Sequence, residues 1–389
     1  MKETAASAWA QARNILCLRL DGIGDLIMTA PAIAALKREK PDRRITLLTS
    51  RVGAEAAALI SEIDDVIVYE APWVKASPAT SSSDDDSEII SRISKAGFDG
   101  AVIFTVYSQN PLPAALLCYL SEIPLRLAHC HENPYQLLTD WVPDPEPATI
   151  LRHEVERQLD LVRSIGCDPR DSTIALKIDE NAHRRVHMLL DDVGIDRRHP
   201  WAVVHPGATA EARRYPSAGY AKAIDILVRQ HGWRMILTGT QSEGAIIESV
   251  RAQTSAPAAS LAGRLNIGES AALLQQAPIL ISNNTAPVHI ASAVGTPVVC
   301  LYALTNPQHM PWRVPSRVLY HDVPCRFCYK STCPEQHHNC LRLVEPESIA
   351  AAAVALLAET DPTRPVKQGL AEMVASRTPV ASEIKAGRR

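Results

Sequence analysis

The chain has 389 residues, more than one ordinary hydrophobic core supports, so its length predicts two domains. Its residues are 46% hydrophobic and its formal net charge is −3, which fits a large globular interior and argues against a basic face for nucleic acid. No run reaches about 18 apolar residues, and residues 1–13 lack the apolar segment of a secretory signal. We therefore expect a cytoplasmic protein with no membrane-spanning helix and no nucleic-acid partner.

The first half of the chain alternates short apolar runs with helical patterns. The apolar runs predict strands at 14–20, 44–50, 65–70 and 98–105, and an amphipathic helix at 26–39 follows the first of them. The Ser- and Asp-rich stretch 77–88 has the composition of a mobile loop. A long helix is predicted at 153–166, after a Pro-rich segment.

The alternation then restarts. Strands are predicted at 201–207, 233–239, 278–284 and 296–302, with a Gly-terminated helix at 215–232 and a last helix at 346–359. This pattern predicts an α/β protein with parallel sheets, in an N-terminal domain of residues 1–190 and a C-terminal domain of residues 191–360. Residues 361–389 are polar and basic, and we expect a disordered tail. Two doubly wound domains facing one another would place a ligand cleft at the carboxyl ends of their strands.

The first strand runs into RLDGIGDLIMTAP, at residues 19–31. This stretch is neither a P-loop nor a dinucleotide fingerprint, because it lacks both Gly-Lys-Ser/Thr and GxGxxG. Its glycines permit a tight turn, and Asp25 falls where an N-cap or first-turn acid would stabilise a helix. Asp25 could equally be a carboxylate at the mouth of a cleft, acting as a general base. Asp21 has the weaker claim to either role.

Two loops of the C-terminal half could bind an anion. After the strand at 201–207, Gly207, Ala208 and Thr209 offer backbone N–H groups and a hydroxyl, and Arg213 and Arg214 offer cationic forks. Adjacent arginines are also compatible with an ordinary solvated face.

After the strand at 278–284, Asn283, Asn284 and Thr285 precede Pro287, and the free N–H groups of a helix start there would attract an anion. His289 lies in the same stretch and is either a structural residue or part of the site. In ILTGTQSE, Glu243 is either a helix cap or an acceptor for ribose hydroxyls.

Four motifs together carry a resemblance to a known family. RLDGIGDLIMTAP, HPGATAEARRYP, LTGTQSE and SNNTAPVHIASAVGTP occur in the order and spacing of glycosyltransferase family 9, the ADP-heptose:lipopolysaccharide heptosyltransferases. The resemblance covers roughly residues 14–358. It implies a GT-B fold of two Rossmann-like domains, a nucleoside-diphosphate heptose donor such as ADP-heptose, and inversion at the anomeric carbon with no cofactor required.

The resemblance also implies roles for individual residues. Asp25 matches the family's proposed catalytic base. The implied donor-binding residues are Thr209, Arg213, Glu243, Asn284, Thr285, Ala286 and His289. Arg213 stands in place of a Lys, Asn284 where an Asp is common and Ala286 where a Gly is usual, and the loss of the Asp charge leaves the donor sugar open. A further expectation is an acceptor side that includes Gly24, Gln109 and Arg126.

The acceptor itself is left open by the resemblance. It could be the lipopolysaccharide core or a related glycan, lipid-linked or not, or a protein, and the enzyme could work peripherally at the inner membrane face. Other interpretations are a protein O-heptosyltransferase or another sugar-nucleotide transferase, or a non-catalytic sugar-nucleotide-binding protein.

Four of the nine cysteines cluster in CRFCYKSTCPEQHHNC, at Cys325, Cys328, Cys333 and Cys340. The CxxC pair has the common spacing of a metal site, whereas the spacing of the second two cysteines is irregular for a zinc ribbon. Four thiolates could close a structural zinc or iron site, and His337 and His338 are additional candidate ligands. Family members often carry such a segment, and some related protein O-heptosyltransferases hold iron there. Reduced structural thiols, or disulfides formed on oxidation, are the alternative.

Overall fold

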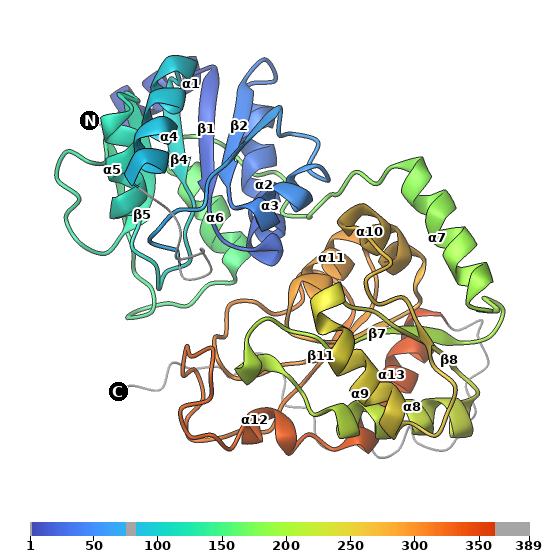
Figure 1. The fold of residues 1–389 in the computed structure, drawn as a ribbon. Coiled ribbons are helices and arrows are strands. Elements are labelled where there is room, and N and C mark those ends of the chain that lie inside the picture. The colour runs from blue at the N-terminus through green and yellow to red at the C-terminus, as the bar shows by residue number, and fades with distance from the viewer. Residues whose placement is uncertain (1, 75–82, 362–389) are drawn as a thin grey trace. The chain divides into compact units, whose positions relative to one another are not determined.

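The computed structural model describes residues 2–74 and 83–361, which form two compact units, Met1–Lys177 and Ile178–Arg389 (Figure 1). The predicted border at 190/191 falls inside helix α7 (Glu180–Asp192), which packs against α10 (Ile267–Gln276) of the second unit. Except for Asp361, the tail predicted at 361–389 lies outside the described residues.

Unit 1 is built on a parallel six-stranded sheet with the order β3-β2-β1-β4-β5-β6. Its strands are β1 (Asn14–Arg19), β2 (Arg44–Thr49), β3 (Asp65–Val68), β4 (Gly100–Ile103), β5 (Leu125–Cys130) and β6 (Asp140–Pro143). The central strand β1 is paired on both sides, with Leu16 opposite Thr46 of β2 and Ala101 of β4. Such a strand is buried on both faces, which explains its continuous apolar run.

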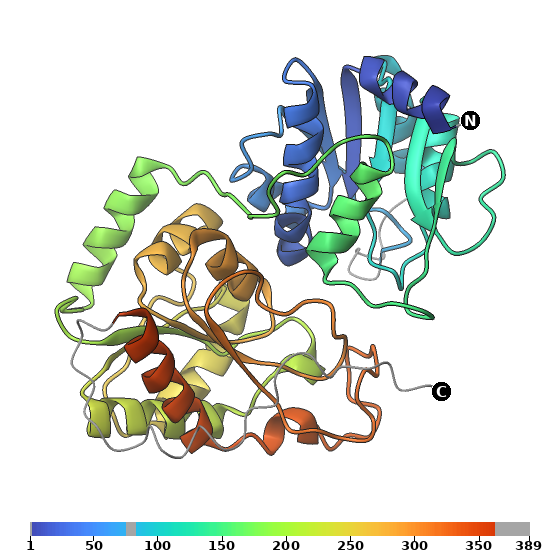
Figure 2. The ribbon, with the colours of Figure 1, turned by 180° about the vertical axis from the view of Figure 1, so that it is seen from behind.

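Helices cover both faces of this sheet (Figures 1 and 2). They are α1 (Lys2–Gln11), α2 (Ile23–Glu39), α3 (Arg51–Ala57), α4 (Ser83–Ala96), α5 (Leu112–Leu120) and α6 (Glu154–Arg163). Helices α2, α3 and α6 share one face, and α6 packs directly on α2. Helices α4 and α5 close the other face through a core that includes Ile93, Ala115 and Leu16.

Unit 2 repeats this architecture with the sheet order β12-β11-β10-β7-β8-β9, again all parallel. Its strands are β7 (Trp201–His205), β8 (Arg234–Leu237), β9 (Ala259–Ser260), β10 (Leu280–Asn283), β11 (Val298–Leu301) and β12 (Ser316–Leu319). Its other helices are η1 (Glu211–Arg213), α8 (Ser217–His231), η2 (Gln241–Glu243), α9 (Gly244–Gln253), α11 (Ala286–Val294), α12 (Asn339–Arg342) and α13 (Pro346–Thr360). Helices α8, α9 and α13 pack on one face over a continuous apolar core, and α7, α10 and α11 lie on the other (Figure 2).

Most of the predicted elements are present, and one prediction is partly wrong. The stretch 77–88 was expected to be a mobile loop, but its second half begins helix α4 at Ser83, while 77–82 lie outside the described residues. Asp84, Asp85 and Asp86 occupy the first turn of α4, where carboxylates interact favourably with the helix dipole. No helix in the described part of the chain is both long and apolar enough to cross a membrane.

The shared strand order fixes where a ligand can bind in each unit. In a doubly wound sheet, ligands bind at the carboxyl ends of the strands where the order reverses. That point lies between β1 and β4 in unit 1 and between β7 and β10 in unit 2. The segments that follow these strands contain Asp25, in the first turn of α2, in unit 1, and Thr209 and Asn284 in unit 2.

Candidate active site

Asp25 lies in the first turn of α2, directly after the central strand of unit 1. The helix begins at Ile23, and its N-cap, Gly22, is extended and supplies no capping side chain. A carboxylate in this turn interacts favourably with the N-terminal end of the helix dipole, as one of the two interpretations of the sequence required. The side chain of Asp25 is 26% exposed, so its carboxylate also reaches the surface at the carboxyl edge of the sheet.

A buried arginine forms an ion pair with this carboxylate. Arg19 is the last residue of β1, and its side chain is completely buried. Its Nη2 lies 3.3 Å from Oδ1 of Asp25, its Nε lies 3.0 Å from Oδ2 of Asp21, and its Nη1 lies 2.9 Å from Oε1 of Glu154. Sequence reasoning missed Arg19 and Glu154, although an Arg at the end of an otherwise apolar strand was a signal.

The three residues expected on the acceptor side lie in different surroundings. Gly24 is the second residue of α2, beside Asp25. Gln109, in the loop after β4, donates a hydrogen bond from Nε2 to Asp21. Arg126 sits near the amino end of β5, where its guanidinium donates to the backbone carbonyls of Ile123, Gln136 and Leu137. These bonds favour a structural role for Arg126.

In unit 2 the loops after β7 and β8 meet around Glu243. Its Oε2 accepts hydrogen bonds from the backbone N–H (2.8 Å) and the hydroxyl (3.0 Å) of Thr240, so it completes a capping box for η2. Burial lowers the pKa of His205, whose Nε2 lies 3.7 Å from this carboxylate. A Cβ at Gly207 would stand only 2.1 Å from Oε1 of Glu243, so the glycine makes room for the carboxylate. Glu243 therefore does cap a helix, and it lies against the loop that carries Thr209.

Asn283, the last residue of β10, ties these loops to the sheet. It is fully buried, and its amide donates to the carbonyls of Pro206 (2.8 Å) and Gly207 (3.3 Å). Its Oδ1 accepts from the backbone N–H of Tyr215 at 3.1 Å. The sequence placed Asn283 in an anion site, but its hydrogen bonds hold the loop after β7 in place.

The two arginines of the same loop, Arg213 and Arg214, have different hydrogen-bond partners. Arg214 donates to the carbonyls of Ala208 (2.7 Å) and Thr209 (3.3 Å), which fixes the loop from within. Arg213 ends η1, and its Nη2 lies 3.4 Å from Oδ1 of Asn306, while its Nε is buried with no hydrogen-bond partner. Thr209 is exposed at the tip. Thr209 and Arg213 thus belong to a loop that Arg214 and Asn283 hold in place.

The helix start after β10 lies beside a buried amide. Thr285 is the N-cap of α11 but makes no side-chain capping bond, and Ala286 is the first helical residue. Asn284 is 2% exposed, and its Oδ1 has no hydrogen-bond partner in the structure. His289 is buried within α11, with its ring edge-on to that of His309 at 6.3 Å between centroids.

The segment after β11 completes this region, and sequence reasoning did not single it out. Asn306 and His309 are buried, and the Asn306 amide lies 2.9 Å from Nδ1 of His309. Through Asn306, the ring pair of His289 and His309 is linked to Arg213. Buried polar side chains in a loop (LTNPQHM) were the available signal, since such groups need partners.

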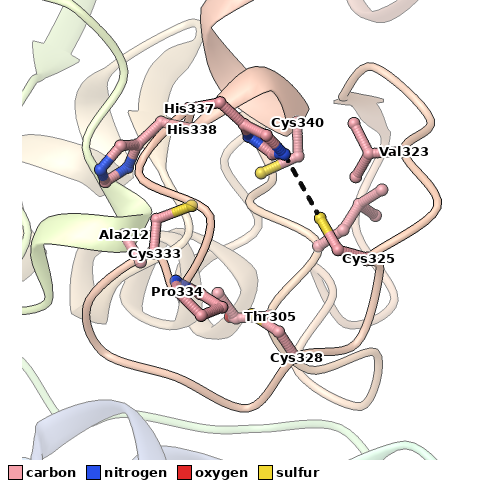
Figure 3. Close-up of a pocket in the computed structure, with 11 residues that line it drawn as sticks. Ala212, Thr305, Val323, Cys325, Cys328, Cys333, Pro334, His337, His338 and Cys340 are labelled. Atoms are coloured by element: carbon pink, nitrogen blue, oxygen red, sulfur yellow. Dashed lines mark hydrogen bonds between the residues drawn. The ribbon is translucent and has the colours of Figure 1, made fainter.

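The cysteine segment lines a pocket of its own (Figure 3). Its walls include Cys325, Cys328, Cys333, Cys340, His337 and His338, together with Ala212 and Thr305. Cys325 Sγ lies 3.7 Å from Nε2 of His337. Burial raises the pKa of the thiols of Cys325 and Cys340. The donor types suit a soft metal, but among the described residues no three His, Cys, Asp or Glu side chains are gathered closely enough to hold one.

Comparison with known proteins identifies the family. The family model described as glycosyltransferase family 9 (heptosyltransferase) matches residues 94–339. The chain belongs to this family. It is therefore a glycosyltransferase, with the family's GT-B fold.

Individual family members resemble the chain over nearly its whole length. Lipopolysaccharide heptosyltransferase 3 of Escherichia coli K12 is 23% identical over 353 residues, which are 87% of this chain and 97% of that protein. Among solved structures, the family 9 glycosyltransferase of Veillonella parvula has a TM-score of 0.76 and 20% identity, covering 89% of this chain and 98% of that one. The E. coli ADP-heptose lipopolysaccharide heptosyltransferase II has a TM-score of 0.70 and 20% identity, covering 89% and 99%.

Proposed function

We propose that this family 9 glycosyltransferase transfers a heptose from ADP-heptose to an acceptor hydroxyl, with inversion at the anomeric carbon and with Asp25 as the general base. The single observation that carries the proposal is the Asp25 carboxylate, held by a buried guanidinium at the carboxyl edge of β1 yet still reaching the surface. Family membership supplies the reaction class, and the name of the E. coli structural relative supplies the donor.

In the proposed reaction the acceptor oxygen attacks the anomeric carbon from the side opposite ADP. Its bond to that carbon forms as the bond between the carbon and the ADP oxygen breaks, and ADP leaves with the electron pair. The hydroxyl proton passes to the Asp25 carboxylate. A free hydroxyl is a weak nucleophile, so removal of its proton during attack lowers the barrier.

The departing ADP gains negative charge, and the loops of unit 2 offer groups to stabilise it. Arg213 and Thr209 present a cation and a hydroxyl, and the start of α11 presents backbone N–H groups. The partnerless Oδ1 of Asn284 is an acceptor for a hydroxyl of the donor sugar. Glu243 lies beside the same loop and could accept from the ribose, since its carboxylate is already positioned by Thr240.

The test compares Asp25→Asn with wild type for ADP release from ADP-heptose in the presence of an acceptor screen. We expect kcat to fall by about a hundredfold to ten-thousandfold, because the amide cannot take a proton. The Kd for ADP, measured by calorimetry, should stay within about twofold. Asp42→Asn is the matched control, since Asp42 is an exposed aspartate of unit 1 that, among the described residues, pairs with Arg13 alone, at 3.5 Å. Transfer by Asp25→Asn at the wild-type rate would refute the base assignment.

The proposal extends to the acceptor and the location. We assign the acceptor to the lipopolysaccharide core or a related glycan, as in the names of the curated relatives. Synthesis of such a glycan from a nucleotide donor fits a cytoplasmic enzyme acting at the inner membrane face. Mass spectrometry of the products of the acceptor screen separates a glycan or lipid-linked acceptor from a protein.

A structural zinc or iron at Cys325, Cys328, Cys333 and Cys340 remains part of the proposal. The thiols, with His337, supply soft donors, but they would have to move closer together to surround an ion. No step of the transfer depends on this ion. Elemental analysis of freshly purified protein tests the proposal, which requires at least about one equivalent of metal per chain.

A further inference from the structure

Arg19 is shared by three carboxylates that come from three different segments. Asp21 follows β1, Asp25 lies in α2 and Glu154 opens α6, and each has an oxygen within 3.3 Å of the guanidinium. Two glutamine amides donate hydrogen bonds to two of these carboxylates. Gln109 donates to Asp21, and Gln158 donates to Glu154 at 2.6 Å.

The three carboxylates differ in their access to solvent. The side chains of Arg19 and Glu154 are completely buried, that of Asp21 is 12% exposed, and that of Asp25 is 26% exposed. Asp21 and Glu154 therefore serve to hold the guanidinium inside the protein, where an uncompensated charge would be very costly. Asp25 alone of the three extends appreciably toward the surface.

Burial and the neighbouring carboxylates act in opposite directions on the pKa of Arg19. Burial alone would lower the pKa of Arg19, but the carboxylates of Asp21, Glu154 and Asp25 outweigh it and raise that pKa, so Arg19 stays cationic. Burial raises the pKa of Asp21 and of Glu154. Arg157, the other cation near Glu154, is itself paired with Asp144 (2.7 Å) and Glu146 (2.8 Å).

A single arginine beside a general base has two opposite effects. It fixes the orientation of the carboxylate, but it also stabilises the charged form and so makes the carboxylate a weaker base. Additional carboxylates on the same guanidinium reduce the loss of basicity and leave the orientation of the carboxylate unchanged. The arrangement of Asp21 and Glu154 around Arg19 meets this requirement.

We infer that Arg19 is a positioning residue that orients the Asp25 carboxylate, and that Glu154 preserves the basicity of Asp25 by sharing the Arg19 charge. The inference rests on the proposed role of Asp25 as general base. It assigns a function in the reaction to two fully buried residues that 135 positions of sequence separate.

The decisive variant is Glu154→Gln, read out as the pH dependence of kcat/KM for transfer. Removing this negative charge leaves Arg19 less neutralised and removes a repulsion from Asp25, so the Asp25 carboxylate holds its proton less strongly. The acidic limb of the profile should move to lower pH by about 0.5–1 unit. Glu154→Asp keeps the charge and should return the limb toward its wild-type position. A purely structural role for Glu154 would change the melting temperature without moving the limb.

The matched control is Glu156→Gln, on the same helix. Glu156 is partly exposed and pairs with Arg163 at 3.4 Å rather than with Arg19, so its removal should leave the acidic limb unchanged. Arg19→Lys tests orientation separately, because it keeps the charge but loses the fork. We expect kcat to fall at least about tenfold with the KM for the donor unchanged.

The outcomes distinguish this inference from the proposed function. An acidic limb that stays in place in folded Glu154→Gln, while Asp25→Asn is inactive, would overturn the inference and leave the base assignment intact. Should Arg19→Lys or Glu154→Gln fail to fold, Asp21→Asn removes another carboxylate from Arg19 at a partly exposed position. It is expected to shift the limb in the same downward direction, and an unmoved limb there would also overturn the inference.

Discussion

The proposed contact between Arg213 and a phosphate of the donor is supported by the surroundings of its side chain. Its guanidinium is partly buried, its Nη2 lies 3.4 Å from the amide oxygen of Asn306, and its Nε has no partner in the structure. A buried N–H without an acceptor costs free energy, which an oxygen of a bound phosphate would recover. The two adjacent arginines of this loop have different partners in the structure. Arg214 donates its hydrogen bonds to backbone carbonyls of the loop, whereas Arg213 does not.

Replacement of Arg213 by Ala should therefore weaken ADP binding. Loss of a charged hydrogen-bond donor corresponds to about 1.5–3 kcal/mol, or roughly a 10- to 150-fold increase in the Kd for ADP. Isothermal calorimetry measures this, and Arg229→Ala on α8 is the control, since Arg229 contacts only the Ser255 carbonyl among the bonds described, at 3.4 Å. An unchanged Kd in Arg213→Ala would place the phosphates elsewhere.

At the scale of elements, the proposed donor site of unit 2 depends on how β10 is joined to the loop after β7. Asn283 stands at the end of β10 and reaches three backbone groups of that loop and the segment before α8. A buried side chain that satisfies three backbone groups cannot be replaced without leaving them unpaired. The loop that presents Thr209 and Arg213 is thus anchored by a residue with no proposed contact to the donor.

Asn283→Ala should lower both stability and donor affinity. Leaving two carbonyls and one N–H unsatisfied should reduce the free energy of unfolding by about 2–4 kcal/mol. Chemical denaturation measures this loss, and calorimetry should show weaker ADP binding at a temperature where the variant is folded. Asn181→Ala, at an exposed position on α7, should change stability by less than about 0.5 kcal/mol. A wild-type unfolding curve for Asn283→Ala would contradict the anchoring role.

The elements that the sequence predicted and those that it missed differ in a physical way. The predicted strands show as apolar runs, in the centre of a sheet (β1, β10) and at an edge (β3) alike, whereas β6 (DWVP) and β12 (SRVL) are partly exposed edge strands with no such run. The buried strand β5 (LRLAHC) was also missed, because Arg126 and His129 interrupt its apolar run. Helix α7 did carry an amphipathic signal, since Ala182, Val186 and Leu189 are its buried residues.

The same distinction holds for the candidate site. The placement of Asp25 in the first turn of a helix follows from local glycine and strand signals, and the structure agrees. Its contact with Arg19 could be suspected from an Arg at the end of a buried strand, but the partnership with Glu154 depends on tertiary folding across 135 residues. No local pattern in one sequence encodes such a pairing.

For the molecule as a whole, two units with the same strand order carry opposite chemistry at the same edge. Around the switch point of unit 1, three carboxylates surround one guanidinium. Around that of unit 2 lie an arginine nitrogen without a hydrogen-bond partner, a hydroxyl, an amide and the N-terminal end of α11, beside a single carboxylate, that of Glu243. A diphosphate would be repelled by the first set and attracted by the second, so the fold permits either edge to bind ADP and the side chains decide between them.

This charge contrast predicts where ADP slows amide hydrogen exchange in the full-length protein. ADP at about 100 times its Kd contributes about 2.7 kcal/mol to the stability of the state that binds it. Protection should therefore appear in peptides that cover 206–214 and 284–290, where the loop after β7 and the start of α11 are proposed to contact the phosphates. Peptides that cover 20–26 should exchange at the same rate with and without ADP, because the carboxylates of unit 1 disfavour an anion. Protection at 20–26 with no change at 206–214 would reverse the assignment of the two units, since the same strand order would then bind the nucleotide at its acidic edge.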